Sequence, residues 1–393
     1  MPILNLKFTE LQWNRIKIGL GILYPVLALI GGLQQYFRGE KEVLGKIYTH
    51  YNNYLIFKTG AIRFWEGLNP FVGDTALHFD TLKYSPPFCL WMNLIAWMPN
   101  LAGIITWNLL NGALIGLGLW LIPLKSERLR IALLAICAIE ALTSFQNLQS
   151  NALIVGCILL AVVCAERKLW VWAPLLIVVA ASVKIFALAA CLVFFFYEGR
   201  WKLVLWSAFW FVVFALSPML VTGYAHFGEV YVWWYNALSE DYSHSLGMSV
   251  MNMFQQFGFE NNKTIVQMGG LGITILGATY LPLWKDLNYR ISIMCSLLLF
   301  MVAFNQRAES PTFVIAVVGA AIYLLNKPMN WKNGLLLFFV IYLTTISATD
   351  LFPRSWRNNF TNPYGLKVLP IFTVWLVLQW DLLKQVVRSN SKI

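Results

Sequence analysis

Apolar runs long enough to cross a lipid bilayer recur along almost the whole of this chain. A spanning helix needs roughly 20 predominantly apolar residues. Twelve runs approach that length, although several are short, and their pattern predicts an all-α, polytopic transmembrane bundle of about 12 spans. The runs are 16–36, 101–123, 129–147, 151–165, 169–182, 185–198, 203–222, 264–284, 290–305, 311–326, 333–349 and 366–384.

The composition agrees with a membrane-embedded chain. Hydrophobic residues make up 59% of the sequence and charged residues only 12%, whereas a soluble domain averages about 25% charged residues. We expect one membrane domain, 1–393, without an attached soluble domain. The six cysteines form no CxxC or Cys/His cluster, which indicates neither a disulfide framework nor a zinc site. The net charge of +11 is spread over short groups between apolar runs and does not indicate a nucleic-acid site.

The distribution of lysine and arginine predicts the orientation, because cytoplasmic loops are enriched in both. With the N-terminus inside, the two termini and the short connections carry 17 of the 29 lysines and arginines. The long polar segments 38–85, 223–263 and 350–365 then all face outside. We therefore expect a multi-pass protein of the inner or plasma membrane, with both termini cytoplasmic and its work done at the outer face.

Two apolar segments do not fit a simple span. Pro86 to Met98 suits a juxtamembrane helix within outer loop one, 38–100, because it is too short to cross and a span there would move Lys125–Arg130 outside. The segment 169–198 carries Lys184 near its middle. A hairpin broken at Lys184 is preferred over one long span, since it keeps that lysine near the outer surface.

Ionisable side chains inside a membrane are costly and usually functional. Glu140 lies six residues before Gln146, hence about 9 Å deep. It is either a cavity-lining acid or a structural hydrogen-bonding partner of a neighbouring helix. Lys184 is either a phosphate-binding cation or a lysine that extends to the interface.

Acids, amides and aromatic side chains interleave in the outer segments, as in a carbohydrate or lipid-phosphate site. The alternative is a set of solvated loops whose polar groups cap helix ends. In outer loop one the candidates are Asn53, Tyr54, Lys58, Asp74, Asp80, Lys83 and Tyr84. In the other outer connections they are Gln146, Gln149, Asn151, Arg307, Glu309, Arg354 and Arg357.

Five motifs in order along the chain resemble those of membrane glycosyltransferase family 87, which has the GT-C fold and includes polyprenyl-phosphate-dependent mannosyltransferases. Gly67–Phe71 is similar to the family's G-x-D-P-Y, and Lys83–Phe88 to its F-x-Y-P-P. Trp107–Asn111 resembles W-x-x-L-N, Gln146–Asn151 resembles G-Q-x-N, and Ser182–Phe186 resembles I-K-x-x-P. The sequence departs from these motifs at Phe145, which replaces the glycine of G-Q-x-N, and in lacking the proline of I-K-x-x-P.

The resemblance implies an inverting sugar transfer from a polyprenyl phosphate to a lipid or glycan acceptor, with a carboxylate as general base and no cofactor or metal. The family's usual aspartate, in D-x-x-x-Y, is missing from His50-Tyr-Asn-Asn-Tyr54. We therefore expect a different carboxylate to be the base. Asp80 is the first choice, Asp74 the second and Glu140 the third.

A leaving phosphate needs cations as its charge develops. Lys184 is the first choice, and Arg307, Arg354 and Arg357 are secondary candidates. The remaining candidates in the outer segments are expected to bind substrate.

Two other functions stay open at this point. A transporter or flippase of lipid-linked sugars would suit many spans with a buried lysine and glutamate, although the chain lacks the internal repeat that transporters often show. A catalytically inactive, GT-C-like assembly protein would account for the missing aspartate.

Overall fold

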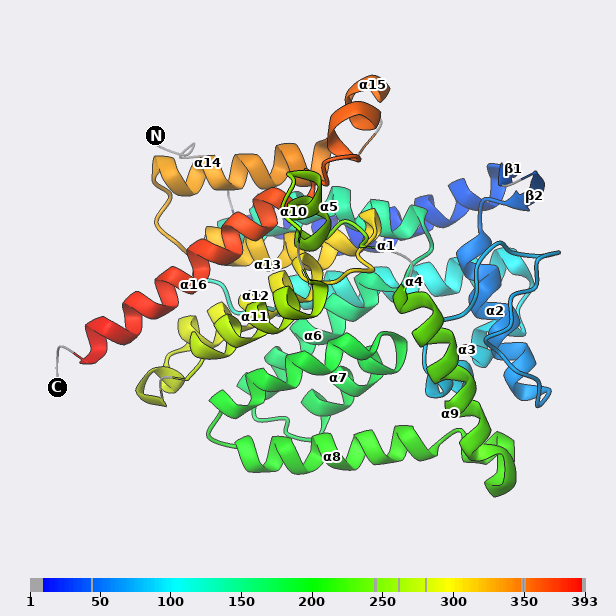
Figure 1. Ribbon diagram of the computed structural model, residues 1–393. Helices are drawn as coiled ribbons and strands as arrows, with labels where there is room; N and C mark the ends of the chain where they lie inside the picture. The colour runs from blue at the N-terminus through cyan, green and yellow to red at the C-terminus, as the bar shows by residue number, and fades with distance from the viewer. Residues whose placement is uncertain are drawn as a thin grey trace.

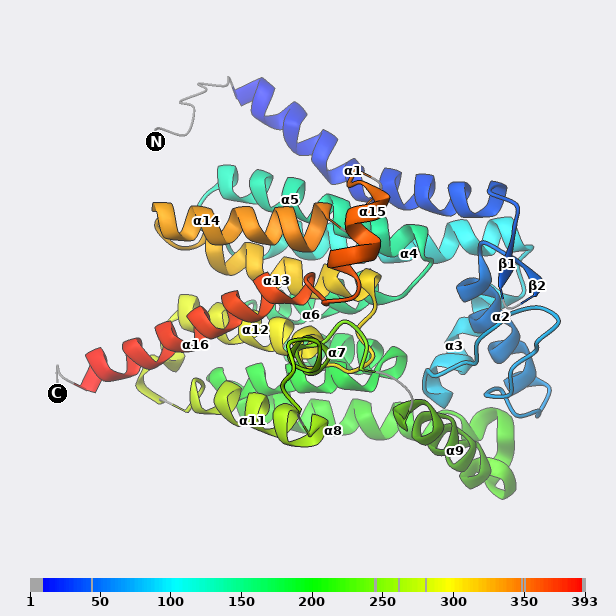
Figure 2. The same ribbon diagram turned by 45° about the horizontal axis from the view of Figure 1, so that its top comes forward.

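Helices form most of the chain, which confirms the predicted helical class. The computed structural model describes residues 10–43, 45–243, 246–260, 262–279, 281–347, 349 and 351–390, so the predicted inner segments 1–17 and 381–393 lie partly outside the described residues. The longer helices form one bundle, in which most of them run alongside their neighbours (Figures 1 and 2). They are α1 (Glu10–Phe37), α4 (Asn100–Leu121), α5 (Glu127–Gln146), α6 (Asn151–Glu166), α7 (Trp172–Val183), the 3-10 helix η1 (Ile185–Phe196), α8 (Arg200–Leu216), α9 (Met219–Ser243), α11 (Lys263–Leu276), α12 (Leu287–Ala303), α13 (Phe313–Leu325), α14 (Trp331–Phe339) and α16 (Val368–Asn390).

Two of the described helices, α4 and α5, are long and apolar enough to cross a membrane. Helices α8 and α9 would form a third span if taken together, but the chain bends by 83° between them. The other apolar helices are 10–17 residues long in the described part of the chain. A count of about twelve spans therefore stays a prediction, while the helical class is confirmed.

The core of the bundle is built on α6 and α13. Every residue of α13 is buried, and most of α6 is buried on all sides, as expected for helices that are apolar all round. Gly156 of α6 allows close contact with α4, because a Cβ there would lie 2.4 Å from the backbone of Leu114.

Outer loop one lies at one end of the bundle (Figure 1) and contains more structure than the predicted juxtamembrane helix. An antiparallel ribbon of β1 (Glu40–Val43) and β2 (Lys46–Thr49) is a departure from an all-α fold. It is followed by α2 (Asn52–Trp65) and α3 (Pro86–Ala96). With 11 residues, α3 is about 16 Å long and too short to cross a bilayer.

The chain breaks at Lys184, as predicted for a hairpin. Lys184 is extended (φ −134°, ψ 115°) between α7 and η1, and these two helices pack against each other. The break places the lysine at the tip of the pair.

Two boundaries differ from the sequence prediction. The polar segment 223–263 contains most of α9 and the short helix α10 (Val250–Gln256), because polarity on one face is also compatible with an amphipathic helix. The run 264–284 is helical only to Leu276, where Gly277 forms the C-cap, and a short 3-10 helix η2 (Leu281–Lys285) follows. The remaining short helices are η3 (Ser310–Thr312), the π-helix η4 (Val340–Ile346), α15 (Arg354–Trp356) and the π-helix η5 (Arg357–Thr361).

Candidate functional site

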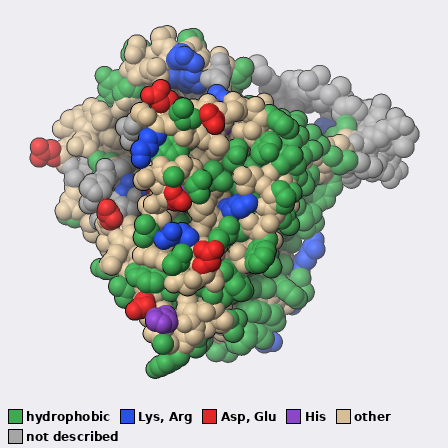
Figure 3. Space-filling model, turned by 90° about the vertical axis from the view of Figure 1, so that its right-hand side faces the viewer, with side chains coloured by type: hydrophobic (Ala, Val, Ile, Leu, Met, Phe, Trp, Pro, Cys, Tyr) green, Lys and Arg blue, Asp and Glu red, His purple; other side chains and the backbone are tan. Residues whose placement is uncertain are grey.

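A cavity of about 430 Å³ lies where outer loop one meets the ends of several helices. Its wall combines residues of α2, the 80–84 segment, the 147–151 turn, the break at Lys184, α9, α11 and the 305–309 loop. Figure 3 faces the end of the molecule that carries outer loop one, where acidic and basic side chains occur close together among polar and hydrophobic ones. The lining residues used below are Asn53, Asp80, Lys83, Tyr84, Gln149, Lys184, Trp234, Gln267, Asn305, Gln306, Arg307 and Glu309.

A chain of hydrogen bonds joins a cation to a carboxylate along one wall of this cavity. Lys184 Nζ donates to Asn151 Oδ1 at 2.8 Å, and Asn151 Nδ2 donates to Gln149 Oε1 at 2.7 Å. Gln149 Nε2 then donates to Glu309 Oε2 at 2.6 Å. The two amides are therefore fixed in orientation, and the ammonium and the carboxylate lie at opposite ends of one polar relay.

Lys184 lies in the break between the two helices of its hairpin, outside both of them. Burial lowers the pKa of Lys184 to about 8, although the carboxylate of Glu309 acts in the opposite direction. A phosphate in the cavity would favour the charged form again, because an opposite charge stabilises an ammonium.

The loop that carries Asp80 is held on several sides. Asp80 forms an ion pair with Lys83 at 3.1 Å and accepts the Thr81 backbone N–H at 2.8 Å. Trp234 of α9 donates its indole N–H to the Lys83 carbonyl at 3.1 Å. The Asp80 side chain keeps 45% of its surface exposed, so it is available to a ligand in the cavity.

Tyr84 anchors outer loop one to the core next to the cavity. Its hydroxyl lies 2.7 Å from Ser150 Oγ, and its ring stacks on Phe57 with centroids 4.9 Å apart. The following residue, Ser85, donates its backbone N–H to the Ser182 carbonyl at 3.2 Å. The loop is thereby docked against the end of α7, close to Lys184.

The structure brings about half of the predicted site residues together. Asn53, Asp80, Lys83, Tyr84, Gln149, Lys184, Arg307 and Glu309 line the cavity, and Asn151 stands behind Gln149 and Lys184. The cavity is also lined by four polar or aromatic residues that were not predicted from the sequence: Trp234, Gln267, Asn305 and Gln306. Asn305 and Gln306 lie beside Arg307, in an outer connection that is polar in sequence. Trp234 and Gln267 come from helices whose sequences gave no indication of a site.

The other predicted residues lie elsewhere. Lys58 Nζ donates to the Met98 carbonyl and to Asn100 Oδ1, both at 2.9 Å. Gln146 donates to Gln34 Oε1 at 2.7 Å. Tyr54 is buried against α4, where a Cβ on Gly103 would meet its hydroxyl.

Asp74, Arg354 and Arg357 also lie away from the cavity wall. Asp74 Oδ1 accepts the Ala76 backbone N–H at 3.1 Å and so stabilises its own loop. Arg354 and Arg357 line a separate, shallow hollow with residues 351–353.

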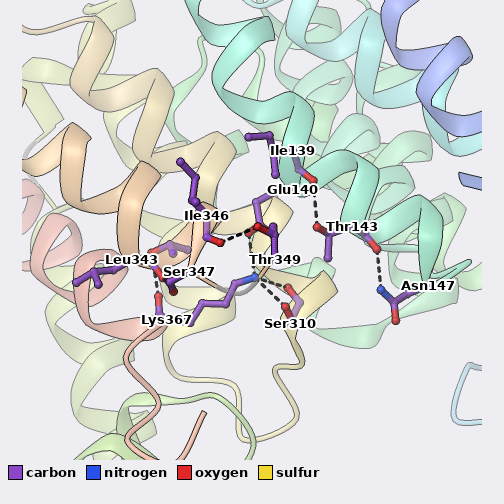
Figure 4. A network of polar contacts seen from close by, with 11 residues as sticks. Ile139, Glu140, Thr143, Asn147, Ser310, Leu343, Ile346, Ser347, Thr349 and Lys367 are labelled. Atoms are coloured by element: carbon purple, nitrogen blue, oxygen red, sulfur yellow. Dashed lines mark hydrogen bonds and ion pairs between the residues drawn. The ribbon is translucent and has the colours of Figure 1, made fainter. Parts of the chain in front are cut away.

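Glu140 is buried away from the cavity and forms an ion pair with Lys367. Its carboxylate lies 2.9 Å from Lys367 Nζ, and the two residues are 0% and 1% exposed. Lys367 also donates to the Ser310 carbonyl at 3.1 Å and to Ser310 Oγ at 2.9 Å (Figure 4). Because Ser310 follows Glu309, this buried pair supports the loop that carries the cavity's carboxylate.

In the described part of the chain, His, Cys, Asp and Glu side chains do not gather into a group of three that would hold a metal ion.

The chain matches a known protein family. The family described as Glycosyltransferase family 87 matches residues 82–328, a range that runs from outer loop one to the end of α13 and contains Tyr84, Gln149, Lys184 and Glu309. No curated protein matches the chain.

Proposed function

Because the chain belongs to glycosyltransferase family 87 and is a glycosyltransferase, we propose that it moves a sugar from a polyprenyl-phosphate donor to a cell-envelope acceptor at the outer face. The observation that supports this donor is the relay of Lys184, Asn151, Gln149 and Glu309 on one cavity wall. A cation suits the phosphate of such a donor, and oriented amide and carboxylate groups suit the hydroxyls of its sugar.

The reaction proposed is an inverting displacement at C1 of the sugar. Asp80 takes the proton of the acceptor hydroxyl, whose oxygen forms a bond to C1. The bond between C1 and the phosphate oxygen breaks, and the polyprenyl phosphate leaves with the electron pair. Lys184 stabilises the charge that develops on the leaving phosphate.

The other cavity residues are proposed to bind substrate. Asn53, Gln149 and Glu309 offer hydrogen bonds to sugar hydroxyls, and the rings of Tyr84 and Trp234 offer apolar surface. Arg307 is the secondary cation within the cavity. Arg354 and Arg357 lie in another hollow and would act on an approaching donor rather than on the reacting phosphate.

Lys184→Met is expected to reduce transfer about ten- to a hundredfold, because a charge-assisted contact to the leaving phosphate is worth about 1.5–3 kcal/mol. The wild-type kcat/KM should also fall as the pH rises through about 8, where Lys184 loses its proton. Steady-state kinetics over a range of pH would measure both effects.

Two matched variants accompany that measurement. Lys184→Arg keeps a charge that does not titrate in this range and should remove the decline above pH 8. Lys58→Met removes a lysine of outer loop one that does not line the cavity and should change the rate little. Unchanged turnover in folded Lys184→Met would exclude the phosphate role.

The proposed orientation places both termini inside and the cavity outside. In a variant without the six native cysteines, an impermeant maleimide applied to intact cells should label Ala76→Cys but not Lys332→Cys, both positions being exposed. The reverse labelling would overturn the orientation, which rests on the distribution of lysine and arginine.

Transfer from a labelled polyprenyl-phosphate sugar to a cell-envelope fraction tests the function as a whole. Labelled product that depends on the purified chain is the expected result. Movement of the labelled donor across the membrane without product would indicate a flippase instead. The absence of both product and movement would indicate an assembly protein.

A further inference from the structure

A second cavity, of about 510 Å³, lies at the opposite end of the helices from the candidate active site. Helix α6 connects the two: Asn151 at its beginning contacts Lys184, and Glu166 at its end lines the second cavity. Sixteen helical residues place these ends about 24 Å apart. The second cavity is therefore a separate site, formed where the turns after α6, after η1 and before α12 meet.

A half-buried ion pair forms the frame of this cavity. Arg290 donates from Nε and Nη2 to the two carboxylate oxygens of Glu166, both at 2.8 Å, and from Nη1 to the Trp284 carbonyl at 2.7 Å. The buried Tyr197 hydroxyl also donates to Glu166 Oε1, at 2.9 Å. Glu166 is thereby fully engaged within the wall, since its carboxylate accepts three hydrogen bonds.

The charge that remains on the wall is mainly positive. Lys168, Arg200 and Lys285 line the cavity, and among the described residues none of them forms an ion pair. Glu198 is the acid on this wall besides Glu166, and it is exposed. Arg200 lies over the ring of Trp284, 5.5 Å from the ring centroid, and this contact holds the arginine against the wall. Lys168 and Lys285 occupy exposed positions.

Apolar surface continues from the mouth of the cavity along α8. Trp201 and Leu205, directly after Arg200, are 67% and 69% exposed, and Trp172 at the start of α7 is 58% exposed. Aromatic side chains of this kind favour the level of the lipid headgroups. A cationic hollow beside an exposed apolar helix matches a molecule with an anionic head and hydrocarbon tails.

We infer that this cavity binds the phosphate of an anionic phospholipid, with Lys168 and Lys285 contacting the headgroup and the acyl chains lying along α8. Basic pockets between helices are known to hold anionic headgroups. The site is independent of sugar transfer. With the orientation proposed above, the lipid would come from the inner leaflet and would hold the turns after α6 and η1 together.

Native mass spectrometry of the purified full chain in detergent tests the inference, with phosphatidylglycerol and phosphatidylcholine of the same acyl chains as probes. The wild type should retain phosphatidylglycerol in preference. Lys168→Gln combined with Lys285→Gln should weaken that binding about 25-fold, since each lysine near an anionic lipid contributes about a fivefold factor. Both lysines are exposed, so the variant should fold normally.

Lys332→Gln is the matched control. Lys332 is an exposed lysine like Lys168 and Lys285, but it does not line this cavity. Phosphatidylglycerol binding should be unchanged in this variant. Equal retention of the two lipids by the wild type would overturn the inference. Competition by millimolar inorganic phosphate would also overturn it, because the site would then take a soluble phosphate.

Discussion

Asp80→Asn is expected to lower the rate of sugar transfer by about two to four orders of magnitude, the usual contribution of a positioned general base. The substitution keeps an oxygen that can accept the Thr81 N–H but removes the group that takes the acceptor's proton. The ion pair with Lys83 is partly exposed, so its loss should change the stability by no more than about 1 kcal/mol. Steady-state transfer rates of the purified variant provide the measurement.

Asp74→Asn is the matched control for this prediction. It makes the same chemical change in the same loop, but Asp74 does not line the cavity and bonds to its own backbone segment. Its transfer rate should remain close to that of the wild type. Full activity in Asp80→Asn would remove Asp80 as the base, and Glu309→Gln would then test the other carboxylate of the cavity.

Lys367→Met is expected to destabilise the fold by about 3–5 kcal/mol, because it leaves the carboxylate of Glu140 buried without a cation. It also removes the two hydrogen bonds to Ser310 and so loosens the loop that carries Glu309. Denaturant unfolding of the purified protein in detergent would measure the loss. Sugar transfer should decrease as well, even under conditions where the variant is fully folded.

Two further variants separate the buried charge from other effects. Glu140→Gln combined with Lys367→Met removes both charges and should recover a large part of the lost stability. Glu229→Gln breaks the exposed pair with His226 and should change the unfolding free energy by less than about 1 kcal/mol. Equal losses for Lys367→Met and Glu229→Gln would show that the Glu140 pair has no special role.

Local patterns were sufficient for much of the fold. The run 101–123 became α4, and 129–147 became α5, each within two residues at either end. The short apolar stretch at the end of outer loop one became α3, and the break at Lys184 appeared where the length of its segment required one. The length of an apolar run and its interruptions are properties of neighbouring residues, so these elements follow from the sequence alone.

Amphipathic helices and short strands were harder to predict from the sequence. α9 looks like a polar loop in sequence because only one of its faces is apolar, and the ribbon of β1 and β2 carries charges that resemble a solvated turn. Whether such a segment is helical or extended depends on the surface against which it packs. That surface belongs to other parts of the chain.

The order of residues shows which side chains are available for a site, whereas the packing of distant segments selects those that meet in one cavity. Gln146 and Gln149 are three residues apart, yet Gln146 bonds to α1 while Gln149 bonds to Glu309, 160 residues further along. The chain turns between them at Leu148, which adopts φ +51°. Lys367 stands at the start of an apolar run, and nothing near it in the sequence indicates that it pairs with Glu140. Such a pair forms only when distant helices pack together and exclude water from both charges.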